Sequence, residues 1–370
     1  MTDSDVVPFR VEVPQAEVDD LRLRLARTRW APAQDLDGER GITQDEVRRL
    51  VEHWSGAWDW REHEAALNAF PQVATTIDGT RIHAVHVRAA REDAPVVVLL
   101  HGWPGSVVEF LRVIGPLSGT AHVVVPSLPG YGFSGPTPTG GWTSQRMAAA
   151  VAELMARLGY TRYVAHGGDW GSRVARDLAV VDPDHVAGIH VTMTNGLEPA
   201  DGGDERAAER ARRYAEELSG YFKTQATKPL SLAYGLTDSP VGQLAWIAER
   251  FRDWTDPASD VLGPQLLDLV LANVAVYWFT GTAGSSSQLY WERRAHPGDE
   301  WSTTVPTGVC VLPHDLRLPV RAAVEPAVNL VSWTELPRGG HFPGIEVPDL
   351  LVDELRRFLA QVWPGAPTDG

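Results

Sequence analysis

Cysteine is nearly absent from this chain of 370 residues, in which Cys310 is the only one. A single thiol excludes an internal disulfide and a thiolate metal cluster. Cys310 stands in an apolar run, residues 309–312, so we expect a buried structural thiol rather than a nucleophile. Lysine is almost as rare, at Lys223 and Lys228 only, while arginine and alanine are abundant. This bias is typical of high-GC bacterial genes and excludes no function.

Basic charge and long apolar runs are also scarce. The chain carries 33 Lys and Arg residues against 48 Asp and Glu, a formal net charge of −15, which argues against a nucleic acid or an anionic membrane as partner. No apolar run approaches the roughly 18 residues that a transmembrane helix needs, and the polar N-terminus is unlike a signal peptide. The sequence therefore predicts a soluble, cytoplasmic protein without a membrane anchor.

Apolar strands and helices alternate through the middle of the chain. Near-continuous apolar runs predict strands at 95–100, 122–125, 162–165 and 187–193. Apolar positions at helical spacing predict a helix at 143–158, and another helix follows the third strand. Strands without polar alternation are typical of a parallel sheet that is covered on both faces. The pattern predicts an α/β fold with a mostly parallel, doubly wound sheet.

Helical patterns replace the strands after about Asn195. Four helices are expected at 207–222, 241–254, 266–279 and 287–294. Two strands and a last helix follow at 308–312, 327–333 and 348–362. A helical insertion at this point lies over the carboxyl ends of the strands, as a lid. The predicted division is an N-terminal extension (1–90), the first half of the core (91–196), a helical lid (197–300) and the second half of the core (301–370).

The extension carries clear local signals. Apolar spacing predicts a helix after Pro14, and Thr43 and Glu46 are spaced as a capping box for a second helix at 44–58. Asp78-Gly79 predicts a tight hairpin turn. The extension also contains four tryptophans, which we interpret as core or docking surface: Trp30, Trp54, Trp58 and Trp60.

Asp169 occupies the sharpest predicted turn of the chain. The third strand runs through small residues into a helix, with Gly167 and Gly171 two residues before and after Asp169. Glycine there lets the backbone turn sharply, as in the nucleophile elbow of an α/β-hydrolase. Lipases and esterases carry serine at the centre of this turn. A carboxylate needs no base to deprotonate it, so we predict direct attack on carbon and a covalent ester.

Such a fold requires an acid and a histidine after the nucleophile in chain order. His341 meets the second requirement, because it lies in a glycine-flanked loop between the last strand and the last helix. Asp315 directly follows a predicted strand, where a carboxylate can orient the imidazole. Glu325 and Glu335 compete for this role, but Glu325 precedes the next strand and Glu335 is close in sequence to His341.

Hydrolysis of an ester needs an oxyanion hole, normally two backbone N–H groups. One is expected from Trp170, directly after the nucleophile, and the other from Trp103. Gly102 permits close approach of the backbone, and Pro104 fixes the turn while it leaves the Trp103 N–H free. No metal or organic cofactor is expected, since the histidines do not pair at ligand spacing and no phosphate-binding loop follows a strand.

These motifs resemble those of the microsomal-type epoxide hydrolases of the α/β-hydrolase fold, which carry an extra N-terminal region. The resemblance covers nearly the whole chain and rests on HGWPGS (101–106), GYGFS (130–134), HGGDWG (166–171), GYFKTQATKP (220–229), DSPVG (238–242), YW (277–278), PTG (306–308) and GGHF (339–342). Family members bind the epoxide oxygen with two lid tyrosines, which by motif position fall on Tyr221 and Tyr290. The family's hydrophobic N-terminal anchor is missing, and Asp315 stands where mammalian relatives have Glu.

The resemblance implies an epoxide hydrolase that forms a vicinal diol from a small hydrophobic epoxide. Tyr221 and Tyr290 would hold the epoxide, Asp169 would attack it, and a water activated by His341 would hydrolyse the ester. Phenol hydroxyls suit this role because they donate without carrying a charge. A haloalkane-type dehalogenase with the same triad and a non-catalytic binding protein remain alternatives. A homodimer, detoxification and antibiotic biosynthesis of the enediyne type all stay open.

Overall fold

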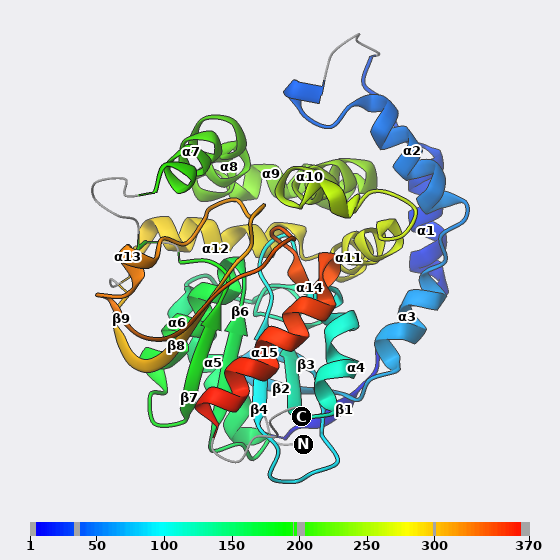
Figure 1. Cartoon of the computed structure of the whole chain (residues 1–370). Helices are drawn as coiled ribbons and strands as arrows, with labels where there is room; N and C mark the ends of the chain where they lie inside the picture. Colours follow the sequence, from blue (N-terminus) through cyan, green and yellow to red (C-terminus); the bar gives the residue numbers. More distant parts are fainter. Residues whose placement is uncertain (1–4, 33–37, 195, 198–203, 299–300, 364–370) are drawn as a thin grey trace.

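A nine-stranded sheet runs through the centre of the protein (Figure 1). The computed structural model describes residues 5–32, 38–194, 196–197, 204–298 and 301–363. The strands are β1 (Val7–Phe9), β2 (Gln72–Ile77), β3 (Thr80–Val87), β4 (Val96–Leu100), β5 (His122–Pro126), β6 (Tyr163–Gly167), β7 (Val186–Val191), β8 (Thr303–Val311) and β9 (Val328–Glu335). Their order is β1-β2-β3-β5-β4-β6-β7-β8-β9. The expected interruption at about Asn195 lies outside the described residues.

Strands β4 to β9 pair in parallel, as predicted. Strands β4, β5 and β6 are buried along their whole length, which explains their uninterrupted apolar sequences. Strand β3 pairs antiparallel with β5 and continues into the antiparallel pairs β2-β3 and β1-β2 at the edge. The turn between β2 and β3 has φ of 51° at Asp78 and 70° at Gly79, so the hairpin prediction is confirmed.

Helices cover both faces of the sheet. They are α4 (Leu111–Ser118), α5 (Ser144–Arg157), α6 (Asp169–Val181), α13 (Arg321–Val324), α14 (Pro343–Glu346) and α15 (Pro348–Val362). Helices α4 and α15 pack on each other in front of the sheet in Figure 1, and α5 packs on α6 at the other face. This is the predicted doubly wound α/β architecture, and it places the ends of β4, β6, β8 and β9 on one side of the molecule.

The lid lies over that side (Figure 1). Its helices are α7 (Glu205–Arg213), α8 (Gly220–Thr227), α9 (Pro229–Asp238), α10 (Pro240–Trp254), α11 (Leu267–Thr280) and α12 (Ala283–Ala295). The predicted single helix at 207–222 is wrong, because a π-helical turn (Tyr214–Leu218) separates α7 from α8. Helix α9 was not predicted. Only its Pro229 and Leu236 are buried, so its sequence shows no amphipathic period.

The N-terminal segment wraps around the edge of the lid. It forms α1 (Gln15–Ala26), α2 (Gln44–Ser55) and α3 (Trp60–Asn68). Helix α2 begins with the predicted capping box, in which the Thr43 side chain accepts from the Glu46 N–H and the Glu46 carboxylate accepts from the Thr43 N–H. The helix ends three residues earlier than the sequence predicts, at Ser55 with Gly56 as its cap.

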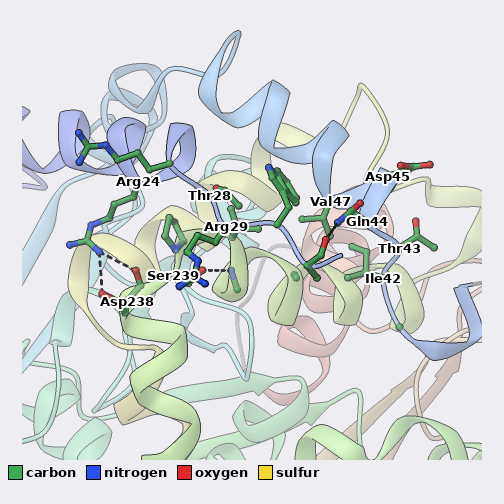
Figure 2. A pocket seen from close by; sticks show the side chains of 18 of the residues that line it. Arg24, Thr28, Arg29, Ile42, Thr43, Gln44, Asp45, Val47, Asp238 and Ser239 are labelled. Carbon is green, nitrogen blue, oxygen red and sulfur yellow. Dashed lines mark hydrogen bonds and ion pairs between the residues drawn. The ribbon is translucent and has the colours of Figure 1, made fainter. Parts of the chain in front are cut away.

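Aromatic side chains dock this segment onto the lid. Trp54, Trp58 and Trp60 are buried, and the Trp60 ring centre lies 4.8 Å from that of Phe279 in α11. Trp30 is only half-buried and lines a cavity of about 1170 Å³ between α1, the segment after it and the start of α10 (Figure 2). None of the predicted site residues lines this cavity.

Candidate active site

Asp169 stands at a strained turn between β6 and α6. Its backbone φ is 46°, a left-handed conformation that is rare for a residue with a side chain. A Cβ on Gly167 would overlap the backbone of Gly171, and a Cβ on Gly171 would overlap the carbonyl of Leu100 in β4. Only glycine allows this close packing of α6 against the sheet. The turn directs the Asp169 side chain into a cavity beneath the lid, as predicted for an elbow.

Two groups contact the Asp169 carboxylate. The Trp103 N–H, in the loop after β4, donates to Oδ1 at 2.8 Å. His341 Nε2 lies 3.5 Å from Oδ2, close enough for an ion pair but too long for a strong hydrogen bond. A Cβ on Gly102 would overlap the Asp169 side chain, so the loop approaches this closely only with glycine. One carboxylate oxygen thus faces the backbone donor and the other faces the histidine.

Asp315 is the acid that contacts His341. The Nδ1–H of His341 donates to Asp315 Oδ1 at 2.7 Å, and both side chains are buried. The Leu316 N–H also donates to this oxygen, at 2.6 Å. Burial alone would lower the pKa of His341, but the carboxylates of Asp315 and Asp169 outweigh burial and raise that pKa to about 10. The resting site therefore holds an imidazolium between two carboxylates.

The two competing acids lie elsewhere. Glu325 ends the short helix α13 and pairs with the exposed Arg321 at 2.6 Å. Glu335 is the last residue of β9 and accepts from the indole of Trp333 at 3.2 Å. Both carboxylates have partners at the surface, away from His341, so the geometry favours Asp315 as the acid that orients the imidazole.

Trp170 follows the nucleophile in the first turn of α6. Backbone N–H groups of a first helical turn have no partner within their own helix, so this amide has the character of an oxyanion donor. The Trp170 ring lines the cavity and lies 5.0 Å from the ring of Tyr290. Its role in an oxyanion hole stays a prediction, whereas the Trp103 N–H already contacts the nucleophile.

Tyr221 of α8 and Tyr290 of α12 converge on the same cavity. Their ring centres are 5.9 Å apart, and both rings contact the indole of Trp103, at 5.1 Å and 5.8 Å. Burial raises the pKa of each phenol well above its usual value of about 10, and both therefore stay protonated. The Tyr290 hydroxyl has no hydrogen-bond partner within the described residues, and the Tyr221 hydroxyl lies 3.3 Å from that of Tyr214.

Asp169, Tyr221 and Tyr290 line one cavity, which has a volume of about 280 Å³. It is lined by Asp169, Trp170, Arg173, Met193, Gly196, Tyr214, Tyr221, Phe222, Tyr290, Arg293, Leu316 and Arg317. The cavity beside Trp30 is larger but is lined by none of the predicted site residues. We place the site in the smaller cavity because it contains the elbow carboxylate and both lid phenols.

Glu346 supports the histidine loop and was not predicted. Its carboxylate accepts from the N–H groups of Gly340 at 3.0 Å and Phe342 at 2.9 Å, which flank His341. It also accepts from the Asp256 N–H at 2.7 Å, just after α10. Burial raises the pKa of Glu346 to about 7, although these hydrogen bonds act in the lowering direction. One carboxylate thus ties the histidine loop to the end of the lid.

Glu109 is a second buried acid that the sequence did not reveal. A Cβ on Gly105 would lie 2.8 Å from Glu109 Oε2, and a Cβ on Gly344 would overlap the Glu109 carbonyl. The side chain is therefore wedged between the loop after β4 and the helix after His341. Burial raises the pKa of Glu109 to about 8, with a smaller opposing effect from His341. No spacing or motif marks either glutamate, because each combines near neighbours with a contact to a distant segment, Asp256 for Glu346 and Gly344 for Glu109.

The described residues form neither a metal site nor a membrane-spanning helix. No group of three His, Cys, Asp or Glu side chains there is arranged to hold a metal ion. Among the helices that the structure describes, none is both long and apolar enough to cross a bilayer. Cys310 is buried in β8, and burial raises the pKa of its thiol well above the usual range.

Comparison with known proteins points to one family over the whole chain. The family model for "Epoxide hydrolase N terminus" matches residues 6–110, and that for "alpha/beta hydrolase fold" matches residues 95–242. A protein of Stigmatella aurantiaca (strain DW4/3-1), named provisionally as an epoxide hydrolase, is 41% identical over 96% of this chain and 85% of its own length. Epoxide hydrolase 1 of Oryctolagus cuniculus is 32% identical over 98% and 90%.

A solved structure extends the likeness to three dimensions. The epoxide hydrolase of Aspergillus niger superposes with a TM-score of 0.89 at 32% sequence identity, and the match covers 97% of each chain. The likeness therefore includes the N-terminal segment, the sheet and the lid together.

Proposed function

This chain belongs to the epoxide hydrolases of the α/β-hydrolase fold, and from that membership we propose that it converts an epoxide and water to a vicinal diol through an ester of Asp169. The observation that carries the proposal is the grouping of side chains in one cavity. A carboxylate on an elbow lies opposite two buried phenols, with the His341–Asp315 pair directly behind it. This set supplies a nucleophile, oxygen-binding donors and a base.

In the first step Tyr221 and Tyr290 hold the epoxide oxygen while Asp169 attacks a ring carbon from the opposite side. Oδ1 already accepts from the Trp103 N–H, so Oδ2 is the oxygen available for attack. The new bond joins Oδ2 to carbon, and the C–O bond of the ring breaks. The phenols stabilise the developing alkoxide by hydrogen bonding, and one of them gives it a proton. Once Asp169 is an ester, the imidazolium of His341 releases its proton, which restores the phenol and leaves a neutral imidazole.

In the second step a water attacks Cγ of the ester. His341 Nε2 takes the proton of this water, and Asp315 holds the resulting imidazolium. The negative charge moves to Oδ1, where the N–H of Trp103 and that of Trp170 form the oxyanion hole. Collapse of this intermediate breaks the Cγ–Oδ2 bond, and the imidazolium of His341 gives a proton to Oδ2, so the diol leaves as a neutral molecule. The proton that the water left on the Asp169 carboxyl then passes to His341, which restores the carboxylate and the imidazolium. The diol therefore carries Oδ2, and the oxygen of the water stays on Asp169.

The walls of the cavity suit a small hydrophobic epoxide. Trp170, Met193, Phe222 and Leu316 supply apolar surface around the reacting groups. Antibiotic biosynthesis of the enediyne type and detoxification both stay predictions of the family resemblance. A panel of racemic aryl and alkyl epoxides shows which substrates are preferred, and chiral analysis of the diols gives the regioselectivity and enantioselectivity.

The rival reaction is dehalogenation with the same triad. A halide ion would need N–H donors, of which Trp170 offers one. Two buried phenols are better suited to an alkoxide, because they can transfer a proton as well as donate a hydrogen bond. Release of halide from chloroalkanes, without diol from styrene oxide, would reverse this choice.

A single turnover in heavy-oxygen water tests the ester. With enzyme in excess over styrene oxide, the diol of the first turnover should contain no label, and peptide mass spectrometry should find the label in Asp169. Label in that first diol would mean that water attacks the epoxide directly, and the covalent scheme would be wrong.

A further inference from the structure

Arg250 is a buried cation in the wall of the lid that the scheme above does not use. It lies on α10 with 6% of its surface exposed. Its guanidinium carbon is 5.4 Å from the centre of the Tyr221 ring and 5.8 Å from the rings of Trp246 and Trp254. Its Nε has no hydrogen-bond partner within the described residues. A buried donor without a partner lowers the stability of a fold. Its presence here therefore suggests that Arg250 serves the function of the site rather than stability.

We propose that Arg250 is a positioning residue for epoxide opening. It holds the Tyr221 ring in place and puts positive charge beside the phenol that donates to the developing alkoxide. This inference rests on the proposed role of Tyr221. Aromatic contacts fix the same ring, since it stacks on Trp103 at 5.1 Å with 7° between the planes and meets Trp254 at 4.9 Å. Arg250 therefore acts on a ring that has little freedom to move away.

The charge of Arg250 matters because the reaction moves negative charge toward it. As Asp169 attacks, one negative charge leaves its carboxylate and develops on the epoxide oxygen, next to Tyr221. A fixed cation in a buried site stabilises such a charge more than it would in solvent. In agreement, burial raises the pKa of Tyr221 while Arg250 acts in the lowering direction. Tyr214 and Asp169 also raise this pKa, so the cation makes Tyr221 a better proton donor than it would be without Arg250.

The other charged groups around Arg250 do not cancel this effect at the phenol. The titratable groups that face Arg250 are Tyr214, Tyr221, Glu249, Arg252, Asp253 and Tyr290. Glu249 forms an ion pair with Arg250, but its second oxygen accepts from the Ile42 N–H at 3.1 Å. This carboxylate thus lies toward the N-terminal segment, whereas the aromatic contacts of Arg250 lie toward the active site.

Pre-steady-state kinetics with two substitutions test the inference. Arg250→Met keeps an apolar stem but removes the charge, and Arg250→Lys keeps the charge. We expect Arg250→Met to slow ester formation about tenfold, which corresponds to about 1.4 kcal/mol. Hydrolysis of the ester once formed should stay within about twofold, and Arg250→Lys should recover most of the lost rate. Rapid quenching with styrene oxide and excess enzyme separates the two steps.

A neighbouring arginine provides the matched control. Arg252 lies on the same helix but pairs with Glu46 and Asp253, and within the part of the chain that the structure describes its guanidinium is not among the cations stacked on the Tyr221 ring. Arg252→Met should therefore leave ester formation within about twofold of the wild type. Equal slowing of both steps by Arg250→Met, without rescue by lysine, would show a merely structural role. Should the methionine variant not fold, slowing of both steps in Arg250→Lys would overturn the inference equally.

A double substitution separates this inference from the proposed function. If Arg250 acts through Tyr221, then Arg250→Met should add less than about twofold to the defect of Tyr221→Phe. Additive effects would contradict that coupling. Normal ester formation in Tyr221→Phe would instead contradict the proposed role of the phenol. A slow Tyr221→Phe beside a normal Arg250→Met would leave the proposed function standing and remove only the role of Arg250.

Discussion

The charge on Asp169 controls the protonation of His341, so Asp169→Asn should bring the pKa of that imidazole down to near neutrality. In the resting protein Asp315 and Asp169 outweigh burial and raise the pKa of His341 to about 10. The Nε2 atom lies 3.5 Å from Oδ2 of Asp169. At this separation and an effective dielectric constant of ~20, one charge pair contributes about 5 kcal/mol, or about 3.5 pH units.

In the proposed scheme, formation of the Asp169 ester removes the same charge. The imidazolium of the resting site would then lose its proton near pH ~7, because only Asp315 still stabilises it. A neutral imidazole accepts a proton from water, whereas an imidazolium does not. The rate of ester hydrolysis should therefore rise with pH through about 7 and level off above it. His341 of the free protein should stay protonated up to about pH 10.

Nuclear magnetic resonance of the imidazole and single-turnover kinetics check this reasoning together. Asp182→Asn is the matched control, since it should lower the pKa of His185, which Asp182 raises, and leave that of His341 unchanged. An imidazole that still titrates near pH 10 in Asp169→Asn would refute the argument. Hydrolysis that keeps rising up to pH 10 would refute it independently.

Three further substitutions test the rest of the site. Asp315→Asn should slow ester hydrolysis roughly 10³-fold, measured by rapid quenching, because the amide no longer holds the productive tautomer of His341; unchanged hydrolysis would return Glu325 and Glu335 as candidates. Glu346→Gln should lower the free energy of unfolding by about 2 kcal/mol in denaturant titrations and slow hydrolysis more than ester formation, since the amide keeps only one of the two oxygens that accept from the Gly340 and Phe342 N–H groups; equal slowing of both steps would contradict a role confined to the loop. Tyr290→Phe should slow ester formation roughly 100-fold. Tyr234→Phe, at a position 79% exposed, should have no effect in the same assay, and a defect there would discredit the comparison.

Local chemistry explains why the elbow and its partners could be predicted. The turn at Asp169 needs glycine two residues away on each side, so residues close in sequence are enough to predict its geometry. The capping box of Thr43 and Glu46 and the turn at Asp78 depend in the same way on near neighbours. His341 could be found because chain order and a glycine-flanked loop restrict the choice.

Contacts between distant segments explain what could not be predicted. Glu346 becomes important only when α10 and the histidine loop meet, because its partners include a residue 90 positions away. In the sequence Arg250 is one of several charged residues of a predicted helix, and nothing there distinguishes it. Only the folded structure places it beside Tyr221. Helix α9 was not predicted because it makes few buried contacts. A helix with only two buried residues leaves no apolar periodicity in the sequence.

The charged groups of this site can be understood through the movement of a single negative charge. It starts on Asp169, where the Trp103 N–H and the imidazolium of His341 stabilise it. In the proposed scheme, attack transfers it to the epoxide oxygen, next to two phenols, one of which contacts Arg250. Its departure lowers the pKa of His341 and so creates the base that the second step requires. Loss of Arg250 and loss of Asp315 should therefore impair different steps, and a variant lacking both should be limited by whichever step is slower.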